Sequence, residues 1–417
     1  MPASNQTCML CGEPLTPAGR CANCEAAVSL RRHKLGLPVL VLIIIAGFSF
    51  TRMVVDWFNH RQDELASAWY QKGVAALNSH RPEQAVEDFE TALVYAKQDD
   101  DEYRVRLADA LLAAGRPNEA RSRLLSLLEE HPTDSVVNLE LARIAAGKGE
   151  LRDAIRYYRG AIDGIWSPGR TPAVERLNAR FELLEVLAAN HQNDAAEAEL
   201  ATLLPELPPS ADAHTRLGQI YFKLGDARRA LAEFQHARQL DRNFAAAYAG
   251  TGAVALQAGD YPAAKRYLME AVRLDDQNAN SKDLLTRTEQ LLAADPFSPG
   301  VNAAERARRT VAAYEAAVKR LDECVRSRAK AAAGGQSHTP SPEMQADEDK
   351  LAQLQSWAEQ LRRYSTEGHL KGHGDVVENM MRFVFATEDA AGRLCGAPNG
   401  MDELLTTIGH HRWGARK

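Results

Sequence analysis

Four cysteines near the start of the chain have the spacing of a metal site. Cys8, Cys11, Cys21 and Cys24 form two Cys-x2-Cys pairs separated by nine residues. Two such pairs can present four thiolates to one tetrahedral Zn²⁺, and a segment this short cannot bury enough apolar surface to fold without a metal. The spacing therefore predicts a structural Zn²⁺ site. Two disulfides, a redox-active pair and unstructured thiols are the alternatives.

The segment around these cysteines resembles the short zinc ribbons found at the N-termini of many bacterial proteins. The resemblance covers residues 7–26, where Gly12 follows the first cysteine pair and Gly19 precedes the second. It implies a small metal-stabilised fold that binds a protein, binds a nucleic acid or has no partner of its own. The few basic residues nearby and the net charge of −6 over 417 residues argue against a nucleic-acid partner.

An uncharged apolar run follows the cysteines. Residues 35–51 carry no charge, and the apolar residues beyond Arg52 extend the run to residue 58, long enough to cross a bilayer. A signal peptide would end in a small-residue cleavage site, and a core helix would carry polar residues at helical spacing; neither pattern is evident. We therefore expect one transmembrane helix over residues 35–58.

The charges on either side of this run predict its orientation. Arg31, Arg32 and Lys34 precede it, whereas acidic residues dilute Arg52 and Arg61 on the other side. Lys and Arg are enriched on the cytoplasmic side of membrane helices. We therefore expect a single-pass protein of the bacterial inner membrane, with its N-terminus in the reducing cytoplasm and the remainder in the periplasm.

Residues 66–294 contain six similar units. The units begin near residues 66, 101, 135, 177, 211 and 245, so the step is 34 or 35 residues except for one of 42, which marks an insertion at 163–175. Each unit has a small residue where its second helix would cross the first: Ala85, Ala120, Ala154, Ala196, Ala230 and Ala264. A larger apolar residue follows one turn later: Phe89, Leu124, Tyr158, Leu200, Phe234 and Leu268. Residues 281–294 have the composition of a capping helix.

This register resembles the tetratricopeptide repeat. The resemblance implies an all-α fold, a right-handed superhelix (an α-solenoid) that binds proteins through a concave face lined by the first helix of each unit. Positions five and nine of the units line that face in the family, and here they include Tyr70, Val74, Val105, Asp109, Leu139, Arg143, Phe181, Glu185, Thr215 and Gln219. Members that hold a terminal carboxylate cluster Lys, Arg and Asn at such positions, and no such cluster is present. The expected ligand is an amphipathic helix or an extended apolar segment of a protein partner, with the chain's own C-terminal region as the alternative occupant.

Residues 301–410 are expected to form a helical C-terminal region. One long amphipathic helix is predicted over 302–331 and a flexible linker over 332–345, with further helices near 347–364, 374–394 and 401–410. Cys324 lies late in the first of these helices and Cys395 at the end of the third. A disulfide between them is expected if this region is outside the cytoplasm, and two unpaired buried thiols are the alternative.

Catalytic motifs are not evident in the sequence. His369 and His373 are four residues apart but lie among glycines, and His410 and His411 are adjacent near the end. No HExxH, GxSxG, P-loop or GxGxxG motif occurs in a usable context. We therefore expect a non-catalytic scaffold or adaptor for protein partners at the membrane, without a nucleic-acid or small-molecule ligand. A cytoplasmic zinc-ribbon sensor coupled to the repeats and a non-catalytic subunit of an envelope enzyme complex are the alternatives.

Overall fold

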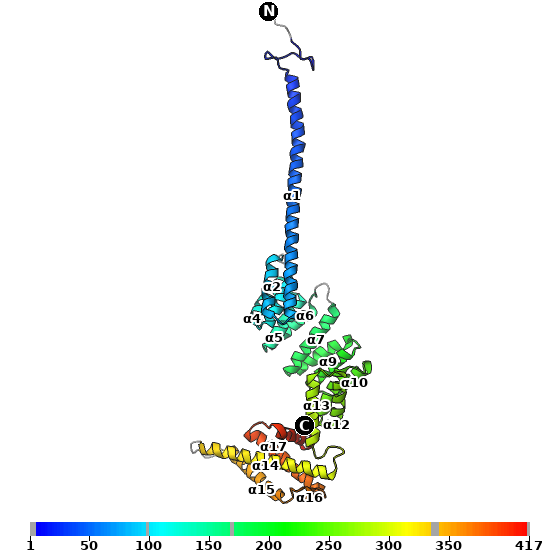
Figure 1. Cartoon of the computed structure of the whole chain (residues 1–417), viewed down its shortest axis with the longest axis vertical. Coiled ribbons are helices and arrows are strands. Elements are labelled where there is room, and N and C mark those ends of the chain that lie inside the picture. Colours follow the sequence, from blue (N-terminus) through cyan, green and yellow to red (C-terminus); the bar gives the residue numbers. More distant parts are fainter. Residues whose placement is uncertain (1–5, 97–99, 167–170, 335–341, 415–417) are drawn as a thin grey trace, which may run out of the picture. The chain divides into compact units, whose positions relative to one another are not determined.

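The computed structural model of the chain is built almost entirely from α-helices (Figure 1). It describes residues 6–96, 100–166, 171–334 and 342–414, without the side chains of 25–39, 331–334 and 342–344. Within these residues β-structure is limited to two isolated bridges, Thr7 with Pro14 and Asp134 with Ile165. The expected all-α fold is therefore confirmed. The chain divides into two compact units, residues 1–176 and 177–417.

A single helix connects the cysteine segment to the first repeat. Helix α1 runs without a break from Ala22 to Asn78, and its 57 residues span about 85 Å at 1.5 Å per residue. The sequence predicts a membrane helix and a separate repeat helix here, so their fusion into one element is a difference. No glycine or proline occurs between Gly47 and Gly73, so no residue in this stretch favours an end to the helix.

The rest of the first unit consists of helix pairs joined by short turns. Gly115 and Gly149 adopt positive φ in these turns, which glycine allows without steric cost. The ring of Phe89 packs so closely on Gly73 of α1 that a Cβ at Gly73 would lie 2.8 Å from it. The helices are α2 (Pro82–Tyr95), α3 (Asp101–Ala113), α4 (Pro117–Glu130), α5 (Ser135–Gly147) and α6 (Leu151–Asp163).

The second unit continues the helix pairs and adds the predicted capping helix. Phe234 repeats the packing of Phe89, because a Cβ at Gly218 would lie 2.7 Å from its ring. The helices are α7 (Pro172–Ala189), α8 (Asn193–Leu203), the short 3₁₀ helix η1 (Leu204–Glu206), α9 (Ala211–Lys223), α10 (Ala227–Leu240), α11 (Ala245–Gln257), α12 (Tyr261–Leu274) and α13 (Ala279–Ala294). The division between the two compact units falls inside α7.

The C-terminal region is a helical bundle with its own core, in which Tyr314, Leu321 and Phe383 are buried. Its helices are α14 (Ala303–Gly334), α15 (Pro342–Arg362), α16 (Glu367–Leu370), α17 (Gly374–Cys395) and α18 (Gly400–Trp413). The linker predicted over 332–345 is shortened at both ends, because α14 extends to Gly334 and α15 begins at Pro342. Its central part, residues 335–341, lies outside the described residues.

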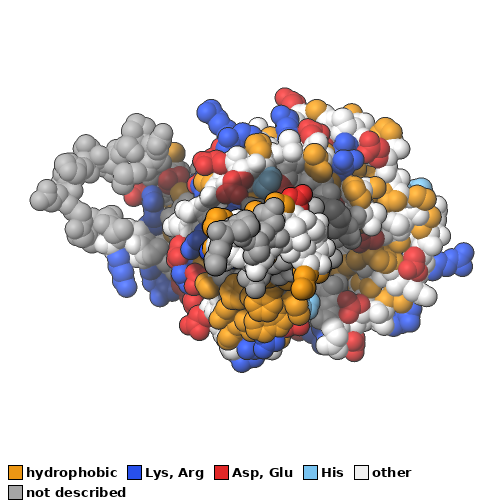
Figure 2. Space-filling model, turned by 90° about the horizontal axis from the view of Figure 1, so that it is seen from above, with side chains coloured by type: hydrophobic (Ala, Val, Ile, Leu, Met, Phe, Trp, Pro, Cys, Tyr) orange, Lys and Arg blue, Asp and Glu red, His pale blue; other side chains and the backbone are white. Residues whose placement is uncertain are grey.

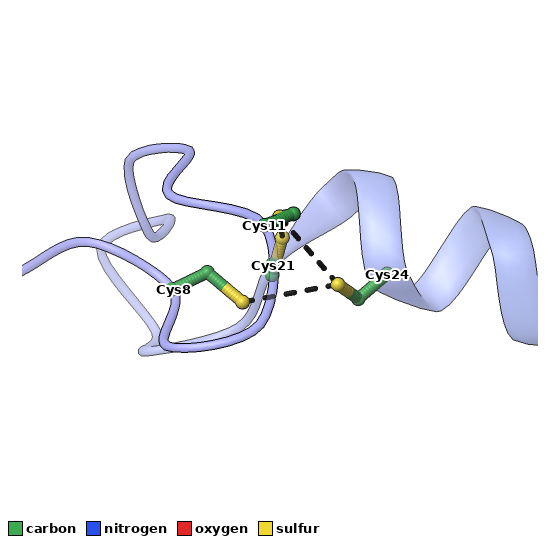
Figure 3. Close-up of side chains that lie close together, drawn as sticks. All are labelled: Cys8, Cys11, Cys21 and Cys24. Atoms are coloured by element: carbon green, nitrogen blue, oxygen red, sulfur yellow. Dashed lines mark hydrogen bonds between the residues drawn. The ribbon is translucent and has the colours of Figure 1, made fainter.

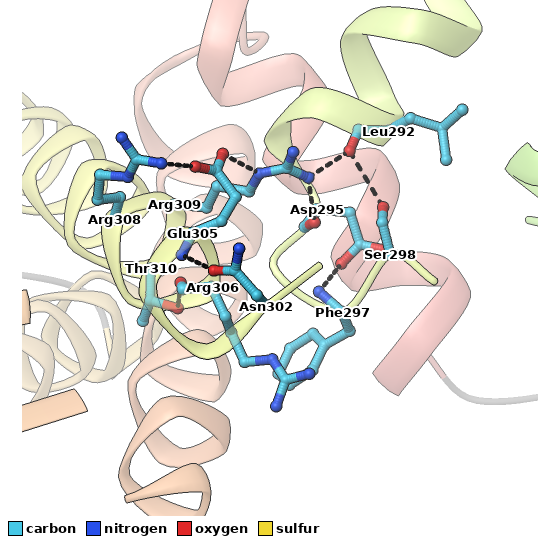
Figure 4. Close-up of polar contacts among 10 residues, drawn as sticks. All are labelled: Leu292, Asp295, Phe297, Ser298, Asn302, Glu305, Arg306, Arg308, Arg309 and Thr310. Carbon is cyan, nitrogen blue, oxygen red and sulfur yellow. Dashed lines mark hydrogen bonds and ion pairs between the residues drawn. The ribbon is translucent and has the colours of Figure 1, made fainter. Parts of the chain in front are cut away.

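Polar contacts join this bundle to the last repeat helix (Figure 4). The guanidinium of Arg309 on α14 donates from Nη1 to the carbonyl oxygens of Leu292 and Asp295, at 2.6 and 3.0 Å. These carbonyls lie at the C-terminus of α13, where no further turn of helix supplies N–H groups to donate to them. Helix α18 also packs on α13, where Ile408 joins a small apolar cluster with Leu291. The C-terminal region therefore caps the end of the repeats.

Candidate functional site

The four N-terminal cysteines come together at the start of α1 (Figure 3). Their Sγ atoms all lie within 4.8 Å of one another, with 3.8 Å between Cys8 and Cys24, 3.4 Å between Cys11 and Cys21, and 3.5 Å between Cys11 and Cys24. A tetrahedral Zn²⁺ with Zn–S bonds of about 2.3 Å requires sulfurs about 3.8 Å apart. The donor set and its geometry therefore fit one divalent metal ion of the zinc type.

Local backbone structure positions these sulfurs. The amide of Gly12 donates to the carbonyl oxygen of Cys8 at 2.9 Å, and Gly12 adopts a φ of +74°, so the first pair sits on a tight turn that favours glycine. Cys21 is the N-cap of α1 and Cys24 lies in its first turn. The partial positive charge of a helix N-terminus favours thiolates at these two positions.

Four thiolates this close together are stable only with a cation among them. Hydrogen bonds from the backbone amides of Leu10 and Cys11 lower the pKa of Cys8 to about 7. Hydrogen bonds with Cys11 and Cys21 raise the pKa of Cys24 to about 12. One thiolate therefore forms readily, whereas four together need a positive ion among them. Zn²⁺ would supply that charge, held by all four cysteines.

The middle of α1 exposes a long apolar surface. It is the one described helix that is long and apolar enough to cross a membrane, and none of its most apolar 18-residue window is buried. A helix of a soluble core would bury such residues. The basic residues 31–34, on which the predicted orientation depends, lie outside the described side chains. The exposed residues are Leu40, Val41, Leu42, Ile43, Ile44, Ile45, Phe48, Phe50, Met53, Val54, Val55, Trp57 and Phe58.

In the first unit, the first helices of neighbouring repeats meet through aromatic and charged side chains. Tyr70 of α1 stacks on Tyr103 of α3 with ring centroids 4.6 Å apart, and its hydroxyl donates to Oε1 of Glu102 at 2.7 Å. Burial, followed by this hydrogen bond to Glu102, raises the pKa of Tyr70. Arg106 and Asp109 continue the same helix with an ion pair of 3.3 Å. An aromatic face with charges of both signs is thus available in this unit.

Three of the residues predicted to contact a partner are buried instead. Leu139 is 4 %, Phe181 0 % and Thr215 2 % exposed, so none can touch a partner without repacking, and the prediction is corrected for them. For Phe181, the neighbouring first helix contributes to this burial, since the guanidinium of Arg216 on α9 lies over the Phe181 ring at 4.1 Å. The remaining predicted residues are partly or fully exposed: Tyr70, Val74, Val105, Asp109, Arg143, Glu185 and Gln219.

Several residues outside positions five and nine also take part in the contacts between neighbouring first helices. Tyr103, Arg106 and Arg216 belong to them, and Arg216 also donates to the side chain of Asn178 at 2.8 Å. Arg106 and Arg216 both occupy the sixth position of their units. Arginine occupies this position in only two of the six units, so the repeat pattern by itself does not single it out.

In the C-terminal region, Cys324 of α14 and Cys395 of α17 form a disulfide with Cα atoms 5.4 Å apart. One turn earlier on α14, Arg320 also contacts α17, because its Nε lies 3.0 Å from Oε2 of the buried Glu388. Its Nη1 lies 3.2 Å from Oδ2 of Asp402 on α18. The disulfide and this arginine together fix α14 against α17 and α18.

The two histidine pairs noted in the sequence make separate contacts. His369 and His373 stack on each other with ring centroids 4.3 Å apart, and Nδ1 of His411 lies 2.6 Å from the hydroxyl of Tyr261. Burial lowers the pKa of His411. Among the described residues, the four N-terminal cysteines are the one group of Cys, His, Asp and Glu close enough together to hold a metal.

Figure 2 shows the described side chains by type, with Lys, Arg, Asp and Glu interspersed among hydrophobic residues.

Comparison with known proteins identifies the repeats. Two models of the tetratricopeptide repeat match the chain, at residues 76–144 and 211–244. No relative is found among curated proteins. Similar solved structures include pilF of Pseudomonas aeruginosa (16% identity, TM-score 0.41, covering 54% of this chain and 98% of that one). PilW, a type IV pilus biogenesis factor, is also similar (17% identity, TM-score 0.43, covering 53% and 98%). So is part of a repeat protein of Cytophaga hutchinsonii (16%, TM-score 0.43, covering 58% and 92%).

Proposed function

We propose that this chain, in which tetratricopeptide repeats are recognised at residues 76–144 and 211–244, is a membrane-anchored adaptor of the bacterial envelope that binds a protein partner through the first helices of its repeats. The observation that carries this proposal is the continuity of α1. The same helix bears the exposed apolar segment and, at Tyr70, the first residue of the partner-binding face. A partner bound there is held close to the membrane, which raises its local concentration.

The two groups of cysteines support an orientation with the repeats in the periplasm. Disulfides persist in oxidising compartments, and Cys324 is bonded to Cys395 beyond the apolar segment. Zinc-binding thiolates require reducing conditions, and the four N-terminal cysteines lie before that segment. One inner-membrane crossing through α1 separates the two environments and satisfies both groups.

The partner-binding face in the first unit favours an amphipathic helix or an extended apolar segment. Tyr70 and Tyr103 offer aromatic surface, while Arg106 and Asp109 offer one charge of each sign. Such a face binds a segment that combines apolar anchors with polar edges. In the second unit, the described contacts of the C-terminal region with the repeats lie at α13 and Tyr261, where the region caps the last repeat. These contacts do not include Glu185 or Gln219, the predicted partner-binding residues of this unit.

Site-specific cross-linking tests the binding face. A photoreactive amino acid is placed at Val74, Asp109 or Arg143 on first helices, and at Glu87 or Arg123 on second helices as matched exposed controls. We expect one partner to be cross-linked from the first-helix positions and not from the controls. Cross-linking from the controls alone, or equally from both sets, would contradict the proposed face.

Thiol labelling tests the orientation independently. Cells are treated with a reagent that does not cross the inner membrane, with and without reductant, and Cys324 and Cys395 are examined. We expect labelling only after reduction. Thiols that react only after the inner membrane is permeabilised would place the repeats in the cytoplasm and refute the envelope proposal.

Regulation by the metal site is a second candidate function, favoured by the position of Cys24. This cysteine lies in the first turn of the helix that ends in the first repeat. Metal binding would therefore fix the N-terminus of a helix that reaches the partner-binding face. A Cys24→Ser variant that keeps wild-type partner cross-linking from Asp109 would exclude this coupling.

A further inference from the structure

We propose that α14 carries a self-complementary face through which two copies of this chain pair in antiparallel orientation. The face consists of six exposed residues, named here the α14 stripe: Ala312, Glu315, Lys319, Asp322, Arg326 and Ala329. Their spacing alternates between three and four residues, so they lie on one side of the helix. The stripe is distinct from the partner-binding face of the repeats.

The order of side chains along the stripe is its own complement when reversed. Glu315 and Arg326 are equally distant from the midpoint between residues 320 and 321, and so are Lys319 and Asp322. A twofold axis through that midpoint therefore places Glu315 opposite Arg326 of the second copy, and Lys319 opposite Asp322 of the second copy. Each pair occurs twice, as an isologous interface requires. The small Ala312 and Ala329 fall opposite each other and permit close approach of the helices.

These charges are available for a second copy. Glu315, Lys319 and Asp322 form no ion pair within the described part of the chain. Earlier on the same helix, by contrast, Arg308 and Arg309 both pair with Glu305. An open groove of about 540 Å³ runs beside the stripe between α14 and α15. The four charged stripe residues line the groove, and Val318 contributes apolar surface to it. A helix bearing the reversed order of charges can therefore approach along the groove.

The opposite side of α14 holds the helix in place. Arg320 and Cys324 point into the bundle, where they contact Glu388 and Cys395 of α17. The stripe is thus presented by a helix that is fixed before association, so little ordering is required when two copies meet.

Charge reversal in the full-length chain tests the pairing. Asp322→Lys places two lysines opposite each other at two symmetric positions, and we expect the dissociation constant of the dimer to rise about tenfold or more, as like charges across an interface repel. Lys319→Asp combined with Asp322→Lys should restore the wild-type constant, because both pairs form again with their signs exchanged. Glu323→Lys is the control: it makes the same change on the adjacent exposed residue, about 100° around the helix from the stripe.

Sedimentation of the detergent-solubilised chain measures these constants, and helix content verifies folding of each variant. A monomeric wild-type chain would overturn the proposal. An Asp322→Lys variant that associates as tightly as the wild type would also overturn it, because that result is expected if α1 alone drives association. A double variant whose dimer dissociation constant stays raised would also overturn the proposal. If α14 instead bound a different protein, the charges of that protein would be unchanged, and exchanging the two charges on α14 would not restore binding.

Disulfide trapping in membranes provides a second readout. Cysteines at positions 315 and 326 are about 16 Å apart along one helix, too far for an intrachain bond. The Glu315→Cys, Arg326→Cys chain should therefore form a covalent dimer under mild oxidation. The Glu315→Cys, Glu323→Cys chain should not form this dimer, because Glu323 lies off the stripe. Equal trapping in both chains would count against the specific antiparallel register.

Discussion

Replacing Glu388 with glutamine should remove a specific pH dependence from the stability of the C-terminal region. The Glu388 side chain on α17 is 0 % exposed. Burial raises the pKa of its carboxyl group to about 8, with a further contribution from the negative charge of Asp402, while Arg320 opposes the rise. In the unfolded chain the same carboxyl group returns to its ordinary pKa of 4.5.

The sign and size of the effect follow from these two pKa values. Between pH 4.5 and 8 the folded chain retains a proton on Glu388 that the unfolded chain releases, so the free energy of unfolding falls as pH rises. The contribution is fully present below pH 4.5 and is lost as pH rises through 8. The change is about 1.4 kcal/mol per pH unit, so a rise of two units within this window removes about 2.7 kcal/mol. Glutamine does not titrate, and its variant should lack this slope.

Hydrogen exchange of the α17 backbone amides in the full chain measures the local opening free energy at each pH, after correction for the intrinsic exchange rate. Glu378→Gln is the matched control, because Glu378 lies on the same helix but is exposed and pairs with Arg382 at 2.9 Å. We expect the control to keep the wild-type slope. If Glu388→Gln and the wild type show the same pH dependence, the buried carboxyl group does not hold its proton and the reasoning fails.

Three further predictions concern the metal, the repeat core and the disulfide. Cys11→Ser should abolish stoichiometric zinc binding, because three thiolates hold the ion less tightly; an unchanged zinc content by elemental analysis would contradict the site. Gly250→Ala should lower the free energy of unfolding by about 1–2 kcal/mol, since the new methyl group meets the ring of Phe234 and outweighs the gain in helix propensity. Adding Phe234→Leu should make the alanine less costly, and strict additivity in thermal unfolding would argue against the clash. Reducing the bond between Cys324 and Cys395, which are 71 residues apart, should destabilise the C-terminal region by about 4 kcal/mol; equal thermal unfolding of reduced and oxidised chains would refute this.

The helical repeats were predictable because their signal is local and recurrent. Each helix pair needs a small residue where its two helices cross, as at Ala85, and a larger apolar residue one turn later, as at Phe89. Ala230 and Phe234 meet the same need in a later unit. Repetition averages out the ambiguity of any single helix. The proximity of the four cysteines was predictable for a similar reason, since two Cys-x2-Cys turns joined by nine residues have little freedom to separate.

The exposure of the partner-binding face was only partly predictable. Position five of a unit gave Tyr70, which is partly exposed, but also Phe181, which is buried under Arg216 of the next unit. Sequence position specifies the direction of a side chain on its own helix. Its exposure depends on the side chains of the neighbouring helix, which a single-unit pattern does not contain.

The sequence by itself determined the elements whose physics is short-range: the helices, the cysteine turns, the apolar segment and the period of the repeats. Tertiary structure decided which distant groups meet. Arg320, Glu388 and Asp402 are separated by up to 82 residues, yet they meet at one partly buried site, and Cys324 is bonded to Cys395 one turn further along α14. Their proximity depends on how α14, α17 and α18 pack, a balance of apolar burial and ion pairing over the whole bundle that no local pattern records.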